Sequence, residues 1–137
     1  MVKRIRFGLK PDTAALFNWF DRILDPAINK AAIEASNRTA DDVLEIAEKL
    51  VPVDEGDLRS TLRKGNVKRR GKAFSEVVIV AGGMKGKVTG KQVDYAGYME
   101  YGTVHIRPRP YVRPAIRKGI KNFPGHFLVA YKKRVPR

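Results

Sequence analysis

The sequence predicts an α+β protein in which N-terminal helices, one of them long, pack on a small antiparallel sheet, followed by a short C-terminal helix. Three observations support this prediction. Apolar residues recur with a helical period over residues 14–51, residues 2–9 and 74–81 read as strands, and a second helical pattern follows Pro110. The 137 residues are enough for one sizeable core. We therefore expect residues 1–137 to form a single domain.

The N-terminal part is expected to begin with a strand and to continue in helices. Residues 5–9 alternate between apolar and polar side chains, which is the period of a half-buried strand. Pro26 interrupts the helical pattern of residues 14–51, because proline cannot donate the backbone hydrogen bond of a helix interior. The pattern therefore predicts one short helix before Pro26 and a long one from there to Leu50.

A turn is expected after the long helix. Pro52 ends the helical pattern, Gly56 suits a tight turn, and Asp57 is the predicted N-cap of a short helix that reaches Lys64. A carboxylate at a helix start can accept hydrogen bonds from the free backbone N–H groups there.

The middle of the chain reads as a basic turn, a strand and a loop. Residues 68–72 are the turn, and the Val-Val-Ile-Val run within 74–81 indicates a strand that is covered on both faces or lies at a subunit contact. Residues 82–91 contain four glycines and three lysines, which predicts a flexible loop. This loop lacks the glycine, lysine and serine or threonine order of a nucleotide-binding loop.

An aromatic and acidic run follows, in which Tyr95, Tyr98 and Tyr101 are three residues apart and Glu100 lies beside them. On a helix this spacing places the three rings near one face. Gly102 is expected to end that helix in a left-handed conformation, which glycine adopts at no steric cost.

Prolines and arginines then alternate: Pro108, Pro110 and Pro114 with Arg107, Arg109 and Arg113. Proline fixes φ and also favours extended angles in the residue before it, so this stretch is expected to form a stiff arm that displays arginines. Pro114 suits the first turn of a helix over residues 112–122. Pro124 and Gly125 are expected to end that helix, and residues 132–137 form a basic tail.

Charge is distributed unevenly along the chain. Residues 1–57 carry 11 acidic and 8 basic side chains, residues 58–137 carry 3 acidic and 20 basic ones, and no acidic residue follows Glu100. A net charge of +14 attracts polyanions such as nucleic acid. The same charge is also typical of a solvated basic face or of a complement to an acidic partner subunit.

Evidence for a catalytic site is weak. Cysteine is absent, and the two histidines, His105 and His126, lack the spacing of metal ligands. Asp54, Glu55 and Asp57 are close enough in sequence to bind a cation, although such a cluster more often forms a turn and a helix cap. We therefore expect no enzyme activity, no metal and no cofactor.

Membrane insertion and secretion are not expected either. No apolar run is long enough to cross a bilayer, and the first ten residues lack the apolar stretch of a signal peptide. The protein is expected to be kept in a cytoplasm or built into an assembly made there.

Two stretches of this chain together resemble the tail-completion (neck) protein family of long-tailed double-stranded DNA phages, which includes minor tail protein Z of phage lambda. The residues that match the family pattern are Pro52, Asp54, Gly56, Leu58, Arg59 and Ser60, then Tyr95, Ala96, Glu100, Tyr101, Gly102 and Thr103, then Pro110, Tyr111, Arg113, Pro114 and Ala115. The chain departs from the pattern at Glu55, where the family usually has threonine, and in a longer and more basic insertion over residues 104–109. The resemblance covers roughly residues 51–115.

The resemblance implies a structural virion protein of the neck, a ring-forming adaptor that joins the head connector to the tail around the DNA passage. The implied partners are copies of itself in a ring, expected to be hexameric when assembled, the head-connector and tail-terminator proteins, and passing DNA held non-specifically. The implied location is the neck or tail of the virion, with the host cytoplasm during assembly.

Assembly rather than turnover is the expected mechanism, so the candidate residues are interface residues. They are Asp54, Asp57, Arg59, Tyr95, Tyr98, Glu100, Tyr101, Arg107, Arg109, Tyr111 and Arg113, with Pro52, Gly56, Gly102 and Pro114 as structural turn residues. Rigid aromatic rings favour interfaces. Asp54 and Asp57 are the candidate partners of a neighbour's arginines, and Tyr111 is expected to enter a neighbour's pocket.

Two other functions stay open at this point. A nucleic-acid-binding module of a mobile element would use the basic C-terminal half, and its DNA binding would be tight and strongly salt-dependent. A small metal-dependent nuclease would use Asp54, Glu55 and Asp57.

Overall fold

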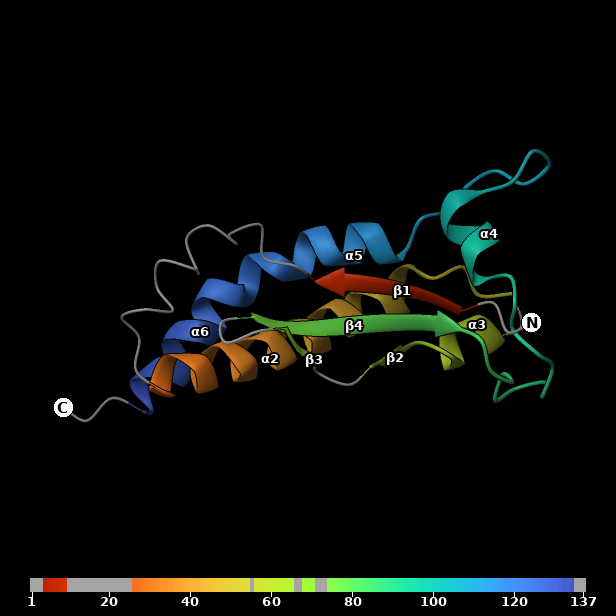
Figure 1. The fold of residues 1–137 in the computed structure, drawn as a ribbon. Helices are drawn as coiled ribbons and strands as arrows, with labels where there is room; N and C mark the ends of the chain where they lie inside the picture. The colour runs from red at the N-terminus through yellow and green to blue at the C-terminus, as the bar shows by residue number, and fades with distance from the viewer. Residues whose placement is uncertain (1–3, 10–25, 55, 66–67, 71–73, 135–137) are drawn as a thin grey trace.

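A computed structural model describes residues 4–9, 26–54, 56–65, 68–70 and 74–134 (Figure 1). The elements are β1 (Arg4–Leu9), α2 (Pro26–Leu50), α3 (Asp57–Ser60), β2 (Arg63–Lys64), β3 (Lys68–Arg70), β4 (Phe74–Gly82), α4 (Ala96–Tyr101), α5 (Val112–Gly119), the 3-10 turn η1 (Ile120–Asn122) and α6 (Phe123–Lys132). The predicted α+β class is confirmed. The short helix expected before Pro26 and the end of the basic tail lie outside the described residues.

The sheet is built around β4, which is antiparallel to each of its neighbours. β1 pairs along one edge of β4 from Arg4 opposite Gly82 to Leu9 opposite Val77. The other edge is shared by β2, opposite Val80 and Ile79, and by β3, opposite residues 74–76. The central place of β4 explains its continuous apolar run, because Val77, Ile79 and Val80 are all buried.

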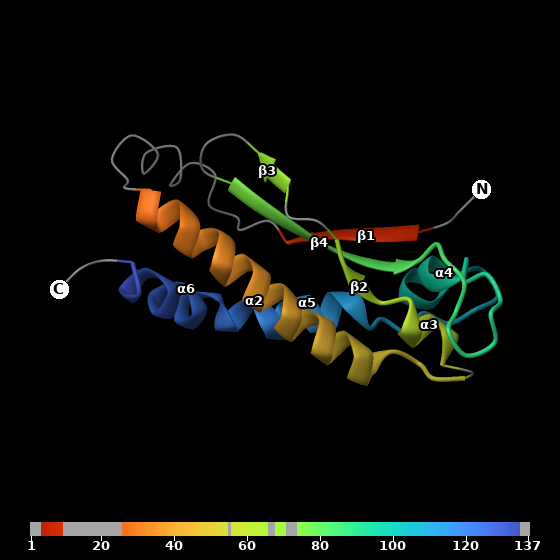
Figure 2. The same ribbon diagram turned by 90° about the horizontal axis from the view of Figure 1, so that it is seen from below.

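The long helix α2 packs against both the sheet and the C-terminal helices. It contacts β4 as well as α5 and α6, and the two ribbon views show α5, η1 and α6 following one another along its length (Figures 1 and 2). Its fully buried residues are mostly small, namely Ala31, Ala35, Ala40, Val43 and Ala47. Small side chains allow neighbouring helices to approach closely, and Gly119 of α5 lies directly against Val43 of α2.

The hydrophobic core is continuous from α2 through β4 to the start of α5. Its buried members include Val43, Leu58, Ile79, Val93 and Tyr111. This core therefore holds one end of the molecule together, the end at which α3, α4 and the start of α5 meet (Figure 2).

Three local predictions about secondary structure were wrong. The helix that starts at Asp57 ends at Ser60 instead of Lys64, and the basic turn contains strand β3, because in both places the backbone pairs with the open edge of β4. Pro124 and Gly125 do not end a helix. Pro124 instead lies in the first turn of α6, where backbone N–H groups have no partner within the helix, so the lack of an N–H costs nothing.

Within the described part of the chain, no helix combines the length and the apolar composition that a membrane span requires.

Candidate assembly interface

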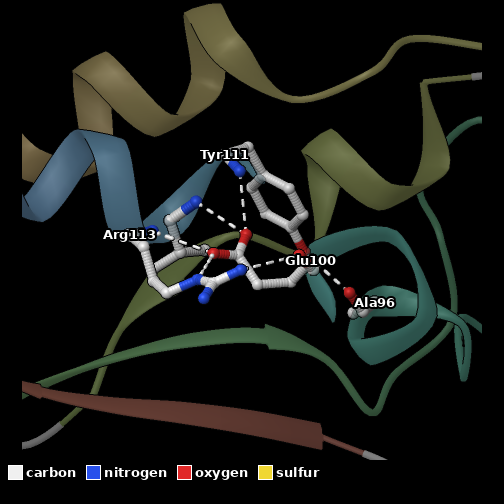
Figure 3. A network of polar contacts seen from close by, with 5 residues as sticks. Ala96, Glu100, Tyr111 and Arg113 are labelled. Atoms are coloured by element: carbon white, nitrogen blue, oxygen red, sulfur yellow. Dashed lines mark hydrogen bonds and ion pairs between the residues drawn. The ribbon is translucent and has the colours of Figure 1, made fainter. Parts of the chain in front are cut away.

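A buried carboxylate joins α4 to the start of α5. Glu100, near the end of α4, has no exposed surface, and its Oε2 accepts hydrogen bonds from the backbone N–H groups of Tyr111 at 2.8 Å and Val112 at 3.0 Å (Figure 3). Its Oε1 accepts from the backbone N–H and the Nε of Arg113, each at 3.0 Å. Glu100 therefore caps the N-terminus of α5 from another helix.

The sequence around α5 explains why that cap comes from a distance. Tyr111 occupies the N-cap position of α5 and provides no side-chain cap, so the first N–H groups of the helix need an acceptor from elsewhere. A carboxylate there also faces the positive end of the helix dipole. The absence of a local cap is a signal in the sequence that α5 needs an acceptor from elsewhere, although it does not identify Glu100 as that acceptor.

The charged form of Glu100 is favoured in spite of its burial. Burial alone would raise the pKa of this carboxyl, but hydrogen bonds from Tyr111, Val112 and Arg113 outweigh it and hold the pKa below the ordinary value of 4.5. The Arg113 guanidinium makes an ion pair with the carboxylate, donates to the Glu100 carbonyl oxygen at 3.2 Å and lies 4.8 Å from the centre of the Tyr101 ring.

Tyr111 closes the other side of this cluster. Its side chain is completely buried, and its hydroxyl donates a long hydrogen bond of 3.4 Å to the Ala96 carbonyl oxygen. Burial and the nearby Glu100 raise the pKa of the phenol, which stays neutral. The pocket that the sequence led us to expect in a neighbour therefore belongs to the same subunit. Glu100 and Arg113, also expected at a subunit contact, are paired with each other.

Gly102 turns the chain out of α4 into the arm, residues 103–110. Its φ is 73° and its ψ is 178°, so the predicted positive φ is confirmed, but ψ lies outside the left-handed helical region. That combination is essentially restricted to glycine. A Cβ here would also lie 2.7 Å from the Ile106 carbonyl oxygen and 2.8 Å from Cδ of Pro108, which leaves no room for a side chain.

We expect Gly102→Ala to destabilise the protein by about 1–3 kcal/mol, because it combines a strained conformation with a clash against the arm. Gly90→Ala is the matched control, since Gly90 has the same φ of 73° and a Cβ added there would meet nothing within 4 Å. Urea unfolding of both variants measures the difference. Equal losses would show that contact with the arm contributes nothing.

The arm itself is exposed but held in place. Every residue from Thr103 to Pro110 is exposed, including the apolar Val104 at 97% and Ile106 at 45%. The Thr103 N–H donates to the Ile106 carbonyl oxygen at 2.9 Å, and the Arg109 N–H donates to that of Met99 at 2.7 Å. The arm projects beyond α4 at the end of the molecule opposite α6 (Figure 1).

A second projection, the loop of residues 82–91, is tied to α3 through Asp57. The Oδ1 of Asp57 accepts hydrogen bonds from the backbone N–H groups of Val88 and Thr89 at 2.9 Å each, and its Oδ2 accepts from the Thr89 hydroxyl. These bonds, those of Thr89 first, hold the pKa of Asp57 below its usual range. Asp57 is 3% exposed, so its carboxylate binds groups of its own subunit and is not accessible to a neighbouring one.

Two hydroxyl groups complete this attachment. Ser60 Oγ accepts from the Lys87 N–H at 2.9 Å, and Thr61 Oγ1 accepts from the Gly82 N–H at 3.0 Å. The sequence analysis missed these polar attachments, because it considered only apolar residues of the loop as possible anchors. The prediction that Asp57 is an N-cap was wrong. Gly56 holds that position with a φ of 82°, and the Asp57 side chain turns to the loop instead.

Hydrogen exchange tests how firmly this loop is held. We expect Asp57→Ala to speed exchange at the amides of Val88 and Thr89, which lose their acceptor, and Ser60→Ala to affect the Lys87 amide instead. The flexibility predicted for residues 82–91 stays a prediction, and slow exchange of these amides in the wild-type chain would contradict it. Equal exchange in the Asp57→Ala variant would show that the carboxylate does not hold the loop.

A family model described as "Bacteriophage HK97-gp10, putative tail-component" matches residues 16–102, which is more than half of the chain. The chain belongs to this HK97-gp10-like family of phage tail components. The predicted resemblance is thus confirmed at the level of a phage tail family. No curated protein and no solved structure matches the chain.

In this HK97-gp10-like chain the matched range runs up to Gly102, so it includes the Asp57 attachment and the Glu100 carboxylate. The arm lies after the match. The matched region therefore contains the residues that hold the base of the arm, while the exposed arm itself, residues 103–110, lies outside the match.

The three tyrosines share the exposed surface next to the arm of this tail component. Tyr95, Tyr98 and Tyr101 are 41%, 41% and 56% exposed, while Glu100 on the same short helix points inward. The common face predicted for the rings stays a prediction, and the expectation that Glu100 lies beside them on the surface was wrong.

The remaining candidates surround the turn before α3. Asp54 and Arg59 are exposed, whereas Pro52 and Gly56 are half-buried. Pro114 lies in the first turn of α5, as predicted. Among the residues that the structure describes, no three histidine, aspartate or glutamate side chains gather as a metal site would require, and Glu55 lies outside them.

Proposed function

We propose that this phage tail component is a structural adaptor of the neck, which forms a ring between the head connector and the tail and acts by assembly rather than catalysis. Copies of itself, expected to form a hexamer, and the head-connector and tail-terminator proteins are the proposed partners, as the resemblance to minor tail protein Z of phage lambda implies. The neck or tail of the virion is the proposed location.

One observation supports this proposal above the others: an exposed arm that is fixed at both ends. Gly102 and Glu100 hold its start, and the buried Tyr111 holds its end. An arm ordered before docking loses little entropy on binding, which favours affinity. An exposed segment that carries Val104, Ile106 and two arginines is otherwise a liability, because apolar surface in water promotes unwanted association.

The test is assembly with tail components, read by electron microscopy and infectivity. We expect the double variant Arg107→Ala/Arg109→Ala to keep its melting temperature, because neither side chain is packed, and to fail to join heads to tails. Lys85→Ala/Lys87→Ala is the control, since it removes the same charge from exposed positions outside the arm. Normal joining by the arm variant would contradict the proposal.

DNA is a second proposed partner. Exposed basic side chains follow α5 to α6 with no acidic residue between them in the sequence, namely Arg117, Lys118, Lys121 and Lys132. Such a surface binds phosphates without reading sequence. A nucleic-acid-binding module would bind DNA tightly with a steep salt dependence, whereas an adaptor needs only modest affinity. The slope of log K against log salt for the isolated protein distinguishes the two.

A further inference from the structure

Most acidic side chains that the structure describes are already paired within the subunit. Glu34 is paired with Arg134, Asp41 with Lys64, Asp42 with His126, Glu45 with Lys49, Asp94 with Gln92, Asp57 with the loop and Glu100 with α5. Glu48 and Asp54 are different, since neither side chain makes a hydrogen bond or ion pair with another described residue. Both belong to the C-terminal end of α2 and the turn after it.

Exposed apolar side chains accompany these two acids. Leu50 is 37% exposed and Val53 is 59% exposed. We call Leu50, Val53 and Asp54 the α2-end patch; Glu48 lies two residues before Leu50 on α2 and therefore faces another side of the helix. The C-terminus of the 25-residue helix adds partial negative charge there, and Lys49 in its last turn is paired with Glu45.

The arm has the opposite charge and the same mixture of side chains. Val104 and Ile106 supply exposed apolar surface, and Arg107 and Arg109 supply positive charge. Arginine forks fit carboxylates in a bidentate way. The arm and the α2-end patch are therefore complementary in both charge and apolar content.

We infer that the arm of one copy docks on the α2-end patch of a second copy of this chain. The two surfaces are distinct, so the contact is head-to-tail, and repeated contacts of this kind close into a ring or continue as a filament. The inference rests on the proposed ring function and specifies the residues of its subunit contact. Of the two acids that the sequence analysis expected to pair with a neighbour's arginines, it keeps Asp54 and excludes Asp57, whose carboxylate is bonded to the loop of its own subunit.

Disulfide trapping tests the contact directly, because the chain contains no cysteine. Ile106→Cys in one batch and Val53→Cys in a second, size-tagged batch give each chain a single thiol on one of the two surfaces. We expect the oxidised equimolar mixture to yield mixed dimers in clear excess over same-type dimers. Lys132→Cys replaces Val53→Cys as an exposed control at the far end, and should yield no such excess.

Charge exchange gives an independent second measurement. We expect Arg107→Glu/Arg109→Glu and Asp54→Arg each to abolish self-association, and their mixture to restore it, since the reversed arm then meets the reversed patch. Light scattering of the full-length chain reports the result. Mixed dimers no more abundant than same-type dimers, or variants that associate like the wild type, would overturn the inference.

The two proposals fail in different ways. A chain that joins heads to tails normally but gives no preferred mixed dimer would leave the adaptor function standing and refute this contact. A preferred mixed dimer in a chain that does not join heads to tails would support the contact and refute the adaptor function.

Discussion

Glu100→Ala is expected to destabilise the protein by about 2–5 kcal/mol, because two buried backbone N–H groups lose their acceptor at about 1–3 kcal/mol each. The change leaves the N–H groups of Tyr111, Val112 and Arg113 without their acceptor and the Arg113 guanidinium without its counter-charge. Buried donors left unpaired carry the full cost of their desolvation. Urea unfolding followed by circular dichroism measures the loss.

Glu100→Gln is the matched control, because it keeps the shape and one acceptor oxygen but removes the charge. We expect an intermediate loss. A Glu100→Ala variant as stable as the wild type would show that water or another group caps α5 equally well, and would refute the proposed role of this carboxylate.

The pH dependence follows from the lowered pKa of Glu100. A group whose folded pKa lies below its unfolded value contributes stability that is present above the unfolded pKa and is lost as the pH falls through the folded one. For Glu100 the loss therefore begins below about pH 4.5. Asp57 and Asp42 have lowered pKa values as well and act in the same direction. We expect Glu100→Gln to reduce the stability difference between pH 7 and pH 3.

Tyr111→Ala is the second change with a large expected effect. Removing a fully buried aromatic side chain leaves a cavity and typically costs about 3–5 kcal/mol. Tyr111 reaches the core that α2, β4 and α5 share, so the cavity would open at the base of the arm. Thermal and urea unfolding should both show the loss.

Tyr111→Phe separates the ring from its hydroxyl. Since the hydrogen bond to Ala96 is 3.4 Å long, we expect this variant to lose less than about 1 kcal/mol. A Tyr111→Ala variant that unfolds like the wild type would instead support the sequence-based expectation, in which this side chain enters a neighbour's pocket and its loss impairs assembly alone.

The fold was predictable where local pattern and tertiary structure agree. The long helix from Pro26 to Leu50 and the strand from Phe74 follow directly from apolar periodicity. β3 was missed because Lys68 to Arg70 carry no apolar alternation, and the strand forms only because β4 offers an open edge.

The candidate site was predicted as a set of residues but not as a set of roles. Sequence spacing cannot show that Glu100 and Tyr111, eleven residues apart, meet across the arm between them. Nor can it show that Asp57 faces Val88 and Thr89, more than thirty residues away. The buried Glu100, Tyr111 and Asp57 stabilise the fold at this end of the subunit, whereas the exposed arm and tyrosines are accessible to other molecules.

Electron cryo-microscopy of tailed particles assembled with this protein tests the central claim most directly. The account predicts this chain in a ring at the neck, with residues 103–110 of each copy buried against the adjacent copy and Glu100 still bound to the start of α5. An arm that faces solvent or the DNA passage in the assembled particle would contradict it.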